Sequence, residues 1–181
     1  MIGEGEYLFK YLVNHLAHGL EIPKGTFRGS RINNLDALPL PAYKYLDMDK
    51  YINSAERKSV DSPRAFPYAR IMTSRGCPIG CCFCQVETIA GAMFRPRSAE
   101  NVLNEIQWLK ETYGIKSLIF DDDNLLHDKK RAKELFQGMI DRNLVMPWLS
   151  IGVAVFKLDE ELIRLMRQSG CEYVAVAIES G

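Results

Sequence analysis

Three cysteines within eight residues constrain this chain more than any other feature of its sequence. Cys77, Cys81 and Cys84 have the spacing C-x3-C-x2-C, in the run Thr73-Ser-Arg-Gly-Cys-Pro-Ile-Gly-Cys-Cys-Phe-Cys84. Thiolates are soft ligands that suit iron-sulfur clusters and zinc. Three of them on one short loop can hold three corners of a cubic 4Fe-4S cluster and leave the fourth iron without a protein ligand. The loop therefore predicts a metal centre with one open position.

Zinc and disulfides are the alternatives to a cluster. Cys82 is a fourth thiol in the same run, so a four-thiolate zinc site is conceivable. Adjacent Cys81 and Cys82 are poorly placed to bind one tetrahedral ion, and zinc is usually held by two separated C-x2-C pairs. Disulfide frameworks are typical of small secreted chains, whose signal peptide pattern is not found here. We expect Cys82 to be a spectator thiol and Cys171 to be a small residue at the start of a strand.

Composition and charge indicate a soluble globular protein. The 181 residues suffice for one ordinary domain, with 47% hydrophobic and 25% charged residues. The 23 basic and 23 acidic side chains balance, so no overall field attracts nucleic acid or an anionic membrane surface. Apolar runs such as 174–178 are far shorter than the roughly 20 residues that span a bilayer. We therefore expect a cytoplasmic protein without a membrane or nucleic-acid partner.

Strands and helices alternate from residue 68 onward. Apolar runs predict strands at 69–74, 116–120, 148–156 and 172–178. Ser98, Asp128 and Asp159 are expected to cap the three intervening helices, whose apolar residues recur at helical spacing. This alternation predicts right-handed crossovers and an α/β fold with a parallel sheet.

The first 66 residues show a different pattern. Leucines recur at helical spacing between Glu6 and His18, and Gly19 is a plausible end for that helix. An ordinary amphipathic helix explains this pattern. Proline and glycine then interrupt residues 20–66, which we expect to form an ordered linker.

The cysteine spacing, with Phe83 directly before the last cysteine, resembles the radical S-adenosylmethionine (radical SAM) family. In that family SAM chelates the open iron. The residues flanking the loop are similar to the branch whose barrel follows a cobalamin-binding domain; they are Thr73-Ser-Arg-Gly-Cys-Pro before it and Gly91, Arg95, Arg97 and Ser98 after it.

The resemblance implies a six-stranded partial (βα)6 barrel of the TIM type, of which this chain would supply the first four strands. Residues 67–181 would be the N-terminal part of the radical SAM core, and 20–66 its linker. Residues 1–19 resemble the last turn and helix of a Rossmann-like cobalamin-binding domain, and would be its C-terminal remnant. Because four strands do not close a barrel, we expect a fragment that is inactive by itself.

The resemblance also implies residues that contact SAM. Asp122 and Asp123 occupy the place of the segment that accepts hydrogen bonds from the SAM ammonium, although a solvated loop explains them too. Phe83 would pack beside the adenine, or simply anchor the loop. Glu179 would lie near the ribose and methionine parts, unless it is merely a polar chain end. No catalytic residue is predicted beyond these cofactor contacts.

The implied reaction is reductive cleavage of SAM to a 5′-deoxyadenosyl radical, with an electron from a donor such as flavodoxin or ferredoxin. In the cobalamin branch, methyl transfer can follow, whereas other members cyclise or rearrange their substrates. The competing interpretations are a simple iron-sulfur or zinc-binding module and an inactive truncated gene product. The substrate is not predicted.

Overall fold

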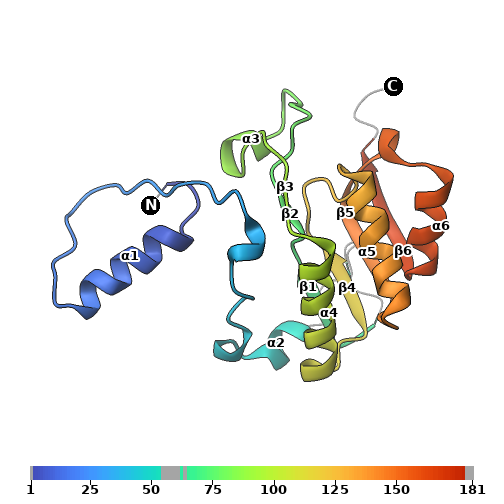
Figure 1. Cartoon of the computed structure of the whole chain (residues 1–181), viewed down its shortest axis with the longest axis horizontal. Helices are drawn as coiled ribbons and strands as arrows, with labels where there is room; N and C mark the ends of the chain where they lie inside the picture. Colours follow the sequence, from blue (N-terminus) through green and yellow to red (C-terminus); the bar gives the residue numbers. More distant parts are fainter. Residues whose placement is uncertain (1, 54–61, 63–64, 178–181) are drawn as a thin grey trace.

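A parallel four-stranded sheet, covered by helices on one face, forms the body of the protein. The computed structural model describes residues 2–53, 62 and 65–177. The strand order is β1-β4-β5-β6, and every neighbouring pair is parallel (Figure 1). The sheet and its helices are β1 (Tyr68–Ile71), α4 (Ala99–Tyr113), β4 (Ser117–Phe120), α5 (Lys129–Asp141), β5 (Trp148–Ala154), α6 (Glu160–Gln168) and β6 (Cys171–Ala177). The predicted α/β fold with a parallel sheet is confirmed.

The three covering helices begin where capping side chains were predicted. Ser98, Asp128 and Asp159 each accept a hydrogen bond from the backbone N–H three residues further along the chain. Such caps satisfy one of the free N–H groups at a helix start. Gly114 ends α4 with a φ of 63°, a left-handed conformation that glycine adopts without strain.

The core lies between the sheet and these helices. Alternate side chains of β4, Leu118 and Phe120, point into it and are at most 1% exposed. Trp148 of β5 stacks on Phe136 of α5 with 5.0 Å between ring centroids, and its indole N–H donates to Ser169 Oγ at 3.0 Å. Each such side chain contributes roughly 1.5 to 3 kcal/mol through burial, so this layer fixes the positions of the strand ends.

The first predicted strand, 69–74, is wrong in its second half. β1 ends at Ile71, and a separate β2 (Ser74–Arg75) pairs antiparallel with β3 (Arg95–Pro96). Beyond β1 the Thr73 backbone N–H bonds to the Asp122 side chain and not to a neighbouring strand. The β2–β3 pair forms a stem, and residues 76–94, with the cysteines and the short helix α3 (Val86–Ile89), form a loop beyond it.

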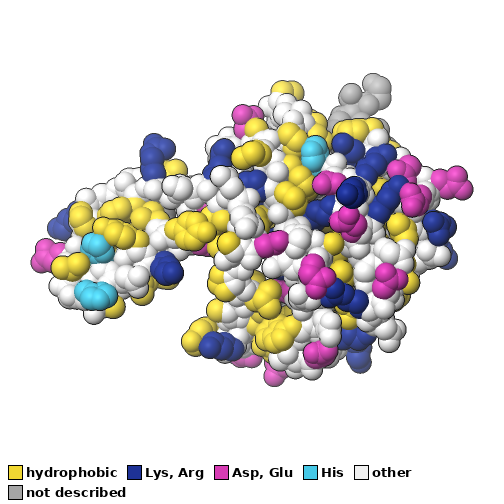
Figure 2. Space-filling view, in the orientation of Figure 1, with side chains coloured by type: hydrophobic (Ala, Val, Ile, Leu, Met, Phe, Trp, Pro, Cys, Tyr) yellow, Lys and Arg dark blue, Asp and Glu magenta, His cyan; other side chains and the backbone are white. Residues whose placement is uncertain are grey.

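The predicted N-terminal helix is confirmed as α1 (Glu6–Ala17). It stands apart from the body of the protein (Figure 1), and none of its twelve described residues is buried. Figure 2 shows hydrophobic side chains along it, and their exposed fractions reach 63% at Phe9 and 60% at Leu16. The fold does not show that residues 1–19 are a remnant of a cobalamin-binding domain.

The described part of 20–66 contains only short helices: η1 (Leu35–Ala37), η2 (Tyr43–Tyr45) and α2 (Met48–Ile52). Leu35 and Ile52 are nonetheless 4% exposed, and Tyr43 packs against Trp108 of α4. This segment is therefore fastened to the body along much of its length. Among the described residues, no helix combines the length and the apolar character needed to cross a membrane.

Candidate functional site

The cysteine loop lies at the carboxyl ends of β1 and β4. Cys77, Cys81 and Cys84 line one small pocket, and Cys82 is not among the described residues around it. Cys77 and Cys81 are partly buried, whereas Cys84 is exposed. No three Cys, His, Asp or Glu side chains in the described part of the chain are close enough to hold one metal ion. The three predicted ligands thus share a pocket without meeting at a single point.

The residues present fit a thiolate-bound cluster. Three soft donors surround one cavity, which is the donor set that iron-sulfur clusters take. The two ends of the loop are already joined, since the Cys77 N–H donates to the Gly91 carbonyl at 3.2 Å. Gly76 makes this approach possible, because its φ is +83° and a Cβ there would lie 2.4 Å from the Met93 carbonyl oxygen.

Asp122 points into the protein and not toward the open edge of the sheet. It continues the alternation of Leu118 and Phe120, and is 2% exposed. Its carboxylate accepts hydrogen bonds from Thr73 N at 3.1 Å, Thr73 Oγ1 at 2.8 Å and Ser74 Oγ at 2.5 Å. Burial raises the pKa of Asp122, although these hydrogen bonds act in the opposite direction. The predicted contact of Asp122 with SAM stays a prediction, and its observed partners are the residues that lead into the cysteine loop.

Asp123 is exposed and lies toward the opening. One of its oxygens accepts a hydrogen bond from Gly76 N at 3.3 Å. Asp123 also lines a hollow of about 630 Å³ with Glu4, Met72 and Arg75, between the N-terminal segment and the strand ends. Of the two predicted aspartates, Asp123 is therefore the exposed one, and its contact with SAM stays a prediction.

Arg95 anchors the returning end of the loop, and sequence reasoning missed its partner. Its side chain is 3% exposed and donates to both carboxylate oxygens of Glu4, at 2.9 and 2.6 Å, and to the Ala90 carbonyl at 2.7 Å. Burial alone would raise the pKa of Glu4, but the hydrogen bonds from Arg95 and from the Ile32 backbone N–H, together with the positive charges of Arg95 and Arg75, outweigh it, and the pKa falls to about 2. The pair joins the N-terminal segment to β3.

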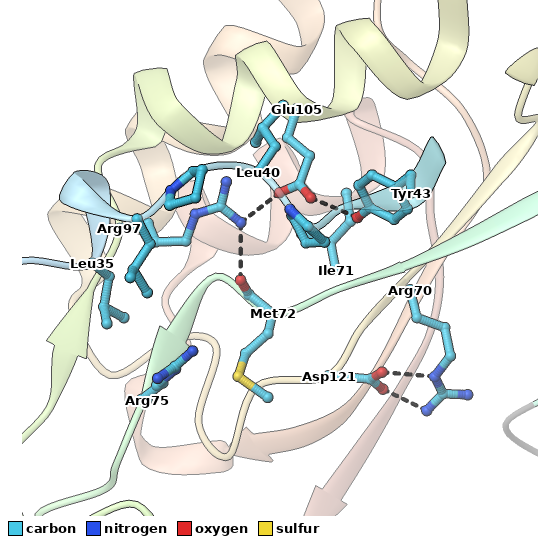
Figure 3. A pocket seen from close by; sticks show the side chains of 13 residues that line it. Leu35, Leu40, Tyr43, Arg70, Ile71, Met72, Arg75, Arg97, Glu105 and Asp121 are labelled. Carbon is cyan, nitrogen blue, oxygen red and sulfur yellow. Dashed lines mark hydrogen bonds and ion pairs between the residues drawn. The ribbon is translucent and has the colours of Figure 1, made fainter. Parts of the chain in front are cut away.

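Arg97 and Arg131 hold the stem from the helix side. Arg97 donates to the Met72 carbonyl at 3.1 Å and to Glu105 at 2.5 Å, and Tyr43 donates to the other oxygen of Glu105 at 2.6 Å (Figure 3). Arg131 donates to the Arg97 carbonyl at 2.6 Å. Arg97, Glu105 and Tyr43 border a pocket of about 270 Å³ beside β1. Its charged residues are largely paired with one another, which suits a structural role.

Two predicted site residues remain untested by this geometry. Phe83 is 66% exposed on the loop and packs on no core cluster among the described residues. Glu179 lies outside the described residues. Their contacts with SAM stay predictions.

A parallel α/β sheet with a three-cysteine loop at its carboxyl edge defines the class of protein. The family model of the Radical SAM superfamily matches residues 71–181. The chain belongs to that superfamily.

Curated relatives and solved structures extend the comparison. The chain is 36% identical to cytidylyl-2-hydroxyethylphosphonate methyltransferase of Streptomyces wedmorensis, over 90% of this chain and 30% of that protein. It is 34% identical to an uncharacterized methyltransferase of Pyrococcus horikoshii, over 98% of this chain and 39% of that protein. It also resembles the radical SAM methyltransferase TsrM of Kitasatospora setae, with a TM-score of 0.66, 22% identity, and 99% and 37% coverage of the two chains. The chain thus spans well under half the length of these proteins.

Proposed function

We propose that this chain is the cluster-binding and SAM-binding part of a cobalamin-dependent radical SAM methyltransferase. The observation that carries the proposal is the placement of Cys77, Cys81 and Cys84 around one pocket at the carboxyl edge of a parallel sheet. The methyltransferase names of relatives in two organisms support the reaction type. A second structure of TsrM has cobalamin and a 4Fe-4S cluster bound. This supports the same cofactors for the present protein. No residue of this chain is assigned to cobalamin.

When bound, a 4Fe-4S cluster supplies the electron that cleaves SAM to a 5′-deoxyadenosyl radical. The chain's own residues would bind the cluster and orient SAM. Cys77, Cys81 and Cys84 would hold three irons, and Asp123 would accept a hydrogen bond from the SAM ammonium. Phe83 and Glu179 would contact the adenine and the ribose or methionine parts. A flavodoxin or ferredoxin is the proposed electron donor.

Anaerobic reconstitution with iron and sulfide tests the cysteine assignment. We expect about four irons and four sulfides per chain, and an EPR spectrum of the reduced protein that changes when SAM is added. Cys77→Ala, Cys81→Ala and Cys84→Ala should each abolish assembly, because each removes one of three ligands. Cys82→Ala is the matched control and should assemble normally. Binding of zinc in place of iron, or loss of the cluster in Cys82→Ala but not in Cys81→Ala, would refute the proposal.

Asp123→Ala tests the SAM contact. A hydrogen bond to a charged group contributes about 1.5 to 3 kcal/mol, so the affinity for SAM should fall roughly 10-fold to 100-fold. Titration calorimetry on the reconstituted chain measures this change. Asp141→Ala, at an exposed position near the end of α5, is the control and should bind SAM as the original chain does. Unchanged affinity in Asp123→Ala with an intact cluster would exclude the contact.

A further inference from the structure

Three consecutive residues after β4 each hold a successive part of the stem that leads to the first cysteine. Asp122 accepts hydrogen bonds from Thr73 and Ser74. Asp123 accepts one from Gly76 N at 3.3 Å. Asn124 then reaches the cysteine itself, with its Nδ2 4.0 Å from Cys77 Sγ. The Cys77 sulfur is thus contacted from the end of β4 as well as by its own loop.

Asn124 is built into the protein and cannot swing away freely. It is 2% exposed. Its own carbonyl accepts a hydrogen bond from His127 N at 3.2 Å, and the next residue, Leu125, donates from its backbone N–H to the Gly152 carbonyl of β5 at 3.2 Å. The backbone is therefore fixed on both sides, and the amide group lies against Cys77. An amide N–H can only donate, and a sulfur that ligates iron accepts, so the observed orientation suits a ligand thiolate.

Hydrogen bonds to ligand sulfurs change the electronic properties of an iron-sulfur cluster. Such a bond withdraws electron density from the sulfur and so stabilises the reduced, more negative state, which raises the reduction potential. The bond also strengthens when the acceptor is ionised, as Cys77 is when it binds iron. Within the described residues, Cys77 is the one of the three predicted ligands whose sulfur receives such a side-chain donor.

We propose that Asn124 is a positioning residue that donates a hydrogen bond to the Cys77 sulfur and raises the reduction potential of the bound cluster. Asp122 and Asp123 keep the stem within its reach. The proposal rests on the proposed function, since it assumes that Cys77 is a cluster ligand. The proposal assigns a role in tuning the cluster to Asn124, a residue outside the cysteine motif.

The reduction potential is the first measurement. The reconstituted chain is titrated anaerobically, and the EPR signal of the reduced cluster is followed. Asn124→Leu keeps most of the side-chain volume but lacks the donor, and its potential should be more negative at unchanged iron content. Asn104→Leu, an exposed position on α4, is the matched control and should leave the potential unchanged. An Asn124→Leu cluster with the original potential would overturn the proposal.

A second measurement needs no substitution at all. In the original chain labelled with ¹⁵N-asparagine, pulsed EPR of the reduced cluster should detect coupling to an asparagine nitrogen. Absence of this coupling overturns the proposal even if Asn124→Leu does not assemble a cluster. Coupling that persists in an assembled Asn124→Ala variant also overturns it, because another asparagine would then be the source. If the original chain binds no 4Fe-4S cluster, the proposed function itself fails, which is a separate and earlier result.

Discussion

Glu4 joins the N-terminal segment to the base of the cysteine loop, beside a second ion pair between Glu6 and Arg75 at 2.7 Å. The Glu4 side chain is 10% exposed and forms an ion pair with Arg95, whose side chain is 3% exposed. Arg95 also donates to the carbonyls of Ile32 and Ala90, each at 2.7 Å. Since Ala90 closes the loop and Ile32 belongs to the linker, one guanidinium connects three segments. Loss of Glu4 would leave a buried cation with carbonyl partners alone.

Glu4→Gln should therefore destabilise the cluster-free chain by about 3 kcal/mol at pH 7, because it breaks a buried ion pair. The folded-state pKa of Glu4 is about 2, below the ordinary glutamate value of 4.5. The stabilisation is thus fully present above about pH 4.5, and is lost as the pH falls toward 2. The penalty of Glu4→Gln should shrink between pH 5 and pH 3 in urea unfolding followed by circular dichroism.

Glu21→Gln, at an exposed position, is the control for this prediction and should change the free energy of unfolding by less than about 0.5 kcal/mol. A Glu4→Gln penalty that is the same at pH 5 and pH 3 would show that the carboxylate charge is not what Arg95 requires.

Residue-level prediction from sequence was good where the signal is local. The capping roles of Ser98, Asp128 and Asp159 depend on a backbone N–H three residues away, and all three are confirmed. The inward orientation of Asp122 had a signal that was overlooked, since it continues the alternation of Leu118 and Phe120. No sequence signal indicated that Glu4 pairs with Arg95. The two residues are 91 positions apart, and only the tertiary fold brings them together.

At the scale of elements, β5 sets how closely the segment after β4 can approach the sheet. Gly152 in β5 has no side chain, and a Cβ there would lie 2.6 Å from the Asp122 carbonyl oxygen and 2.8 Å from that of Asp123. Real Cβ atoms do not approach backbone oxygens so closely. The absence of a side chain at Gly152 is thus a condition for the position of residues 122–124.

Gly152→Ala should displace this segment and loosen its hold on the stem of the cysteine loop. Overpacking of this kind costs typically 1 to 3 kcal/mol, which urea unfolding would detect. The reconstituted variant should also release iron to a chelator faster than the original chain does. Ile151→Ala changes the neighbouring position, which is 41% exposed, and should affect iron release little. Equal release rates in Gly152→Ala and the original chain would contradict this account.

The longer helices and strands were predictable from the sequence, whereas the shortest strands were not. The helices α4, α5 and α6 and the strands β4, β5 and β6 have enough residues for a periodic pattern, and the sequence placed them all. β2 and β3 have two residues each and no periodicity, so the stem was missed. The stem depends on side chains from distant elements, Asp122 after β4 and Arg131 in α5. Such partners are visible only in the folded chain.

At the scale of the whole molecule, α1 is attached at its N-terminal end, where Glu6 pairs with Arg75 at 2.7 Å, and not through its apolar face. Residues 2–5 are held by Glu4 and by the bridge between Ile2 and Arg28. The helix that follows contributes no residue to the hydrophobic core cluster, as far as the described residues show. The free energy of unfolding of the sheet and its helices should therefore be insensitive to the apolar side chains of α1.

A comparison of two leucines tests whether the stability of the body is independent of α1. Leu16 of α1 is 60% exposed, whereas Leu109 of α4 is fully buried. Leu109→Ala should lower the free energy of unfolding by 2 to 5 kcal/mol, as large-to-small changes in cores typically do, and Leu16→Ala by less than about 0.5 kcal/mol. Fluorescence of Trp108 and Trp148 follows the transition, and both lie in the sheet-and-helix body. A Leu16→Ala loss that approaches the Leu109→Ala loss would mean that the face of α1 packs on the body in solution, and that its attachment extends beyond its N-terminal end.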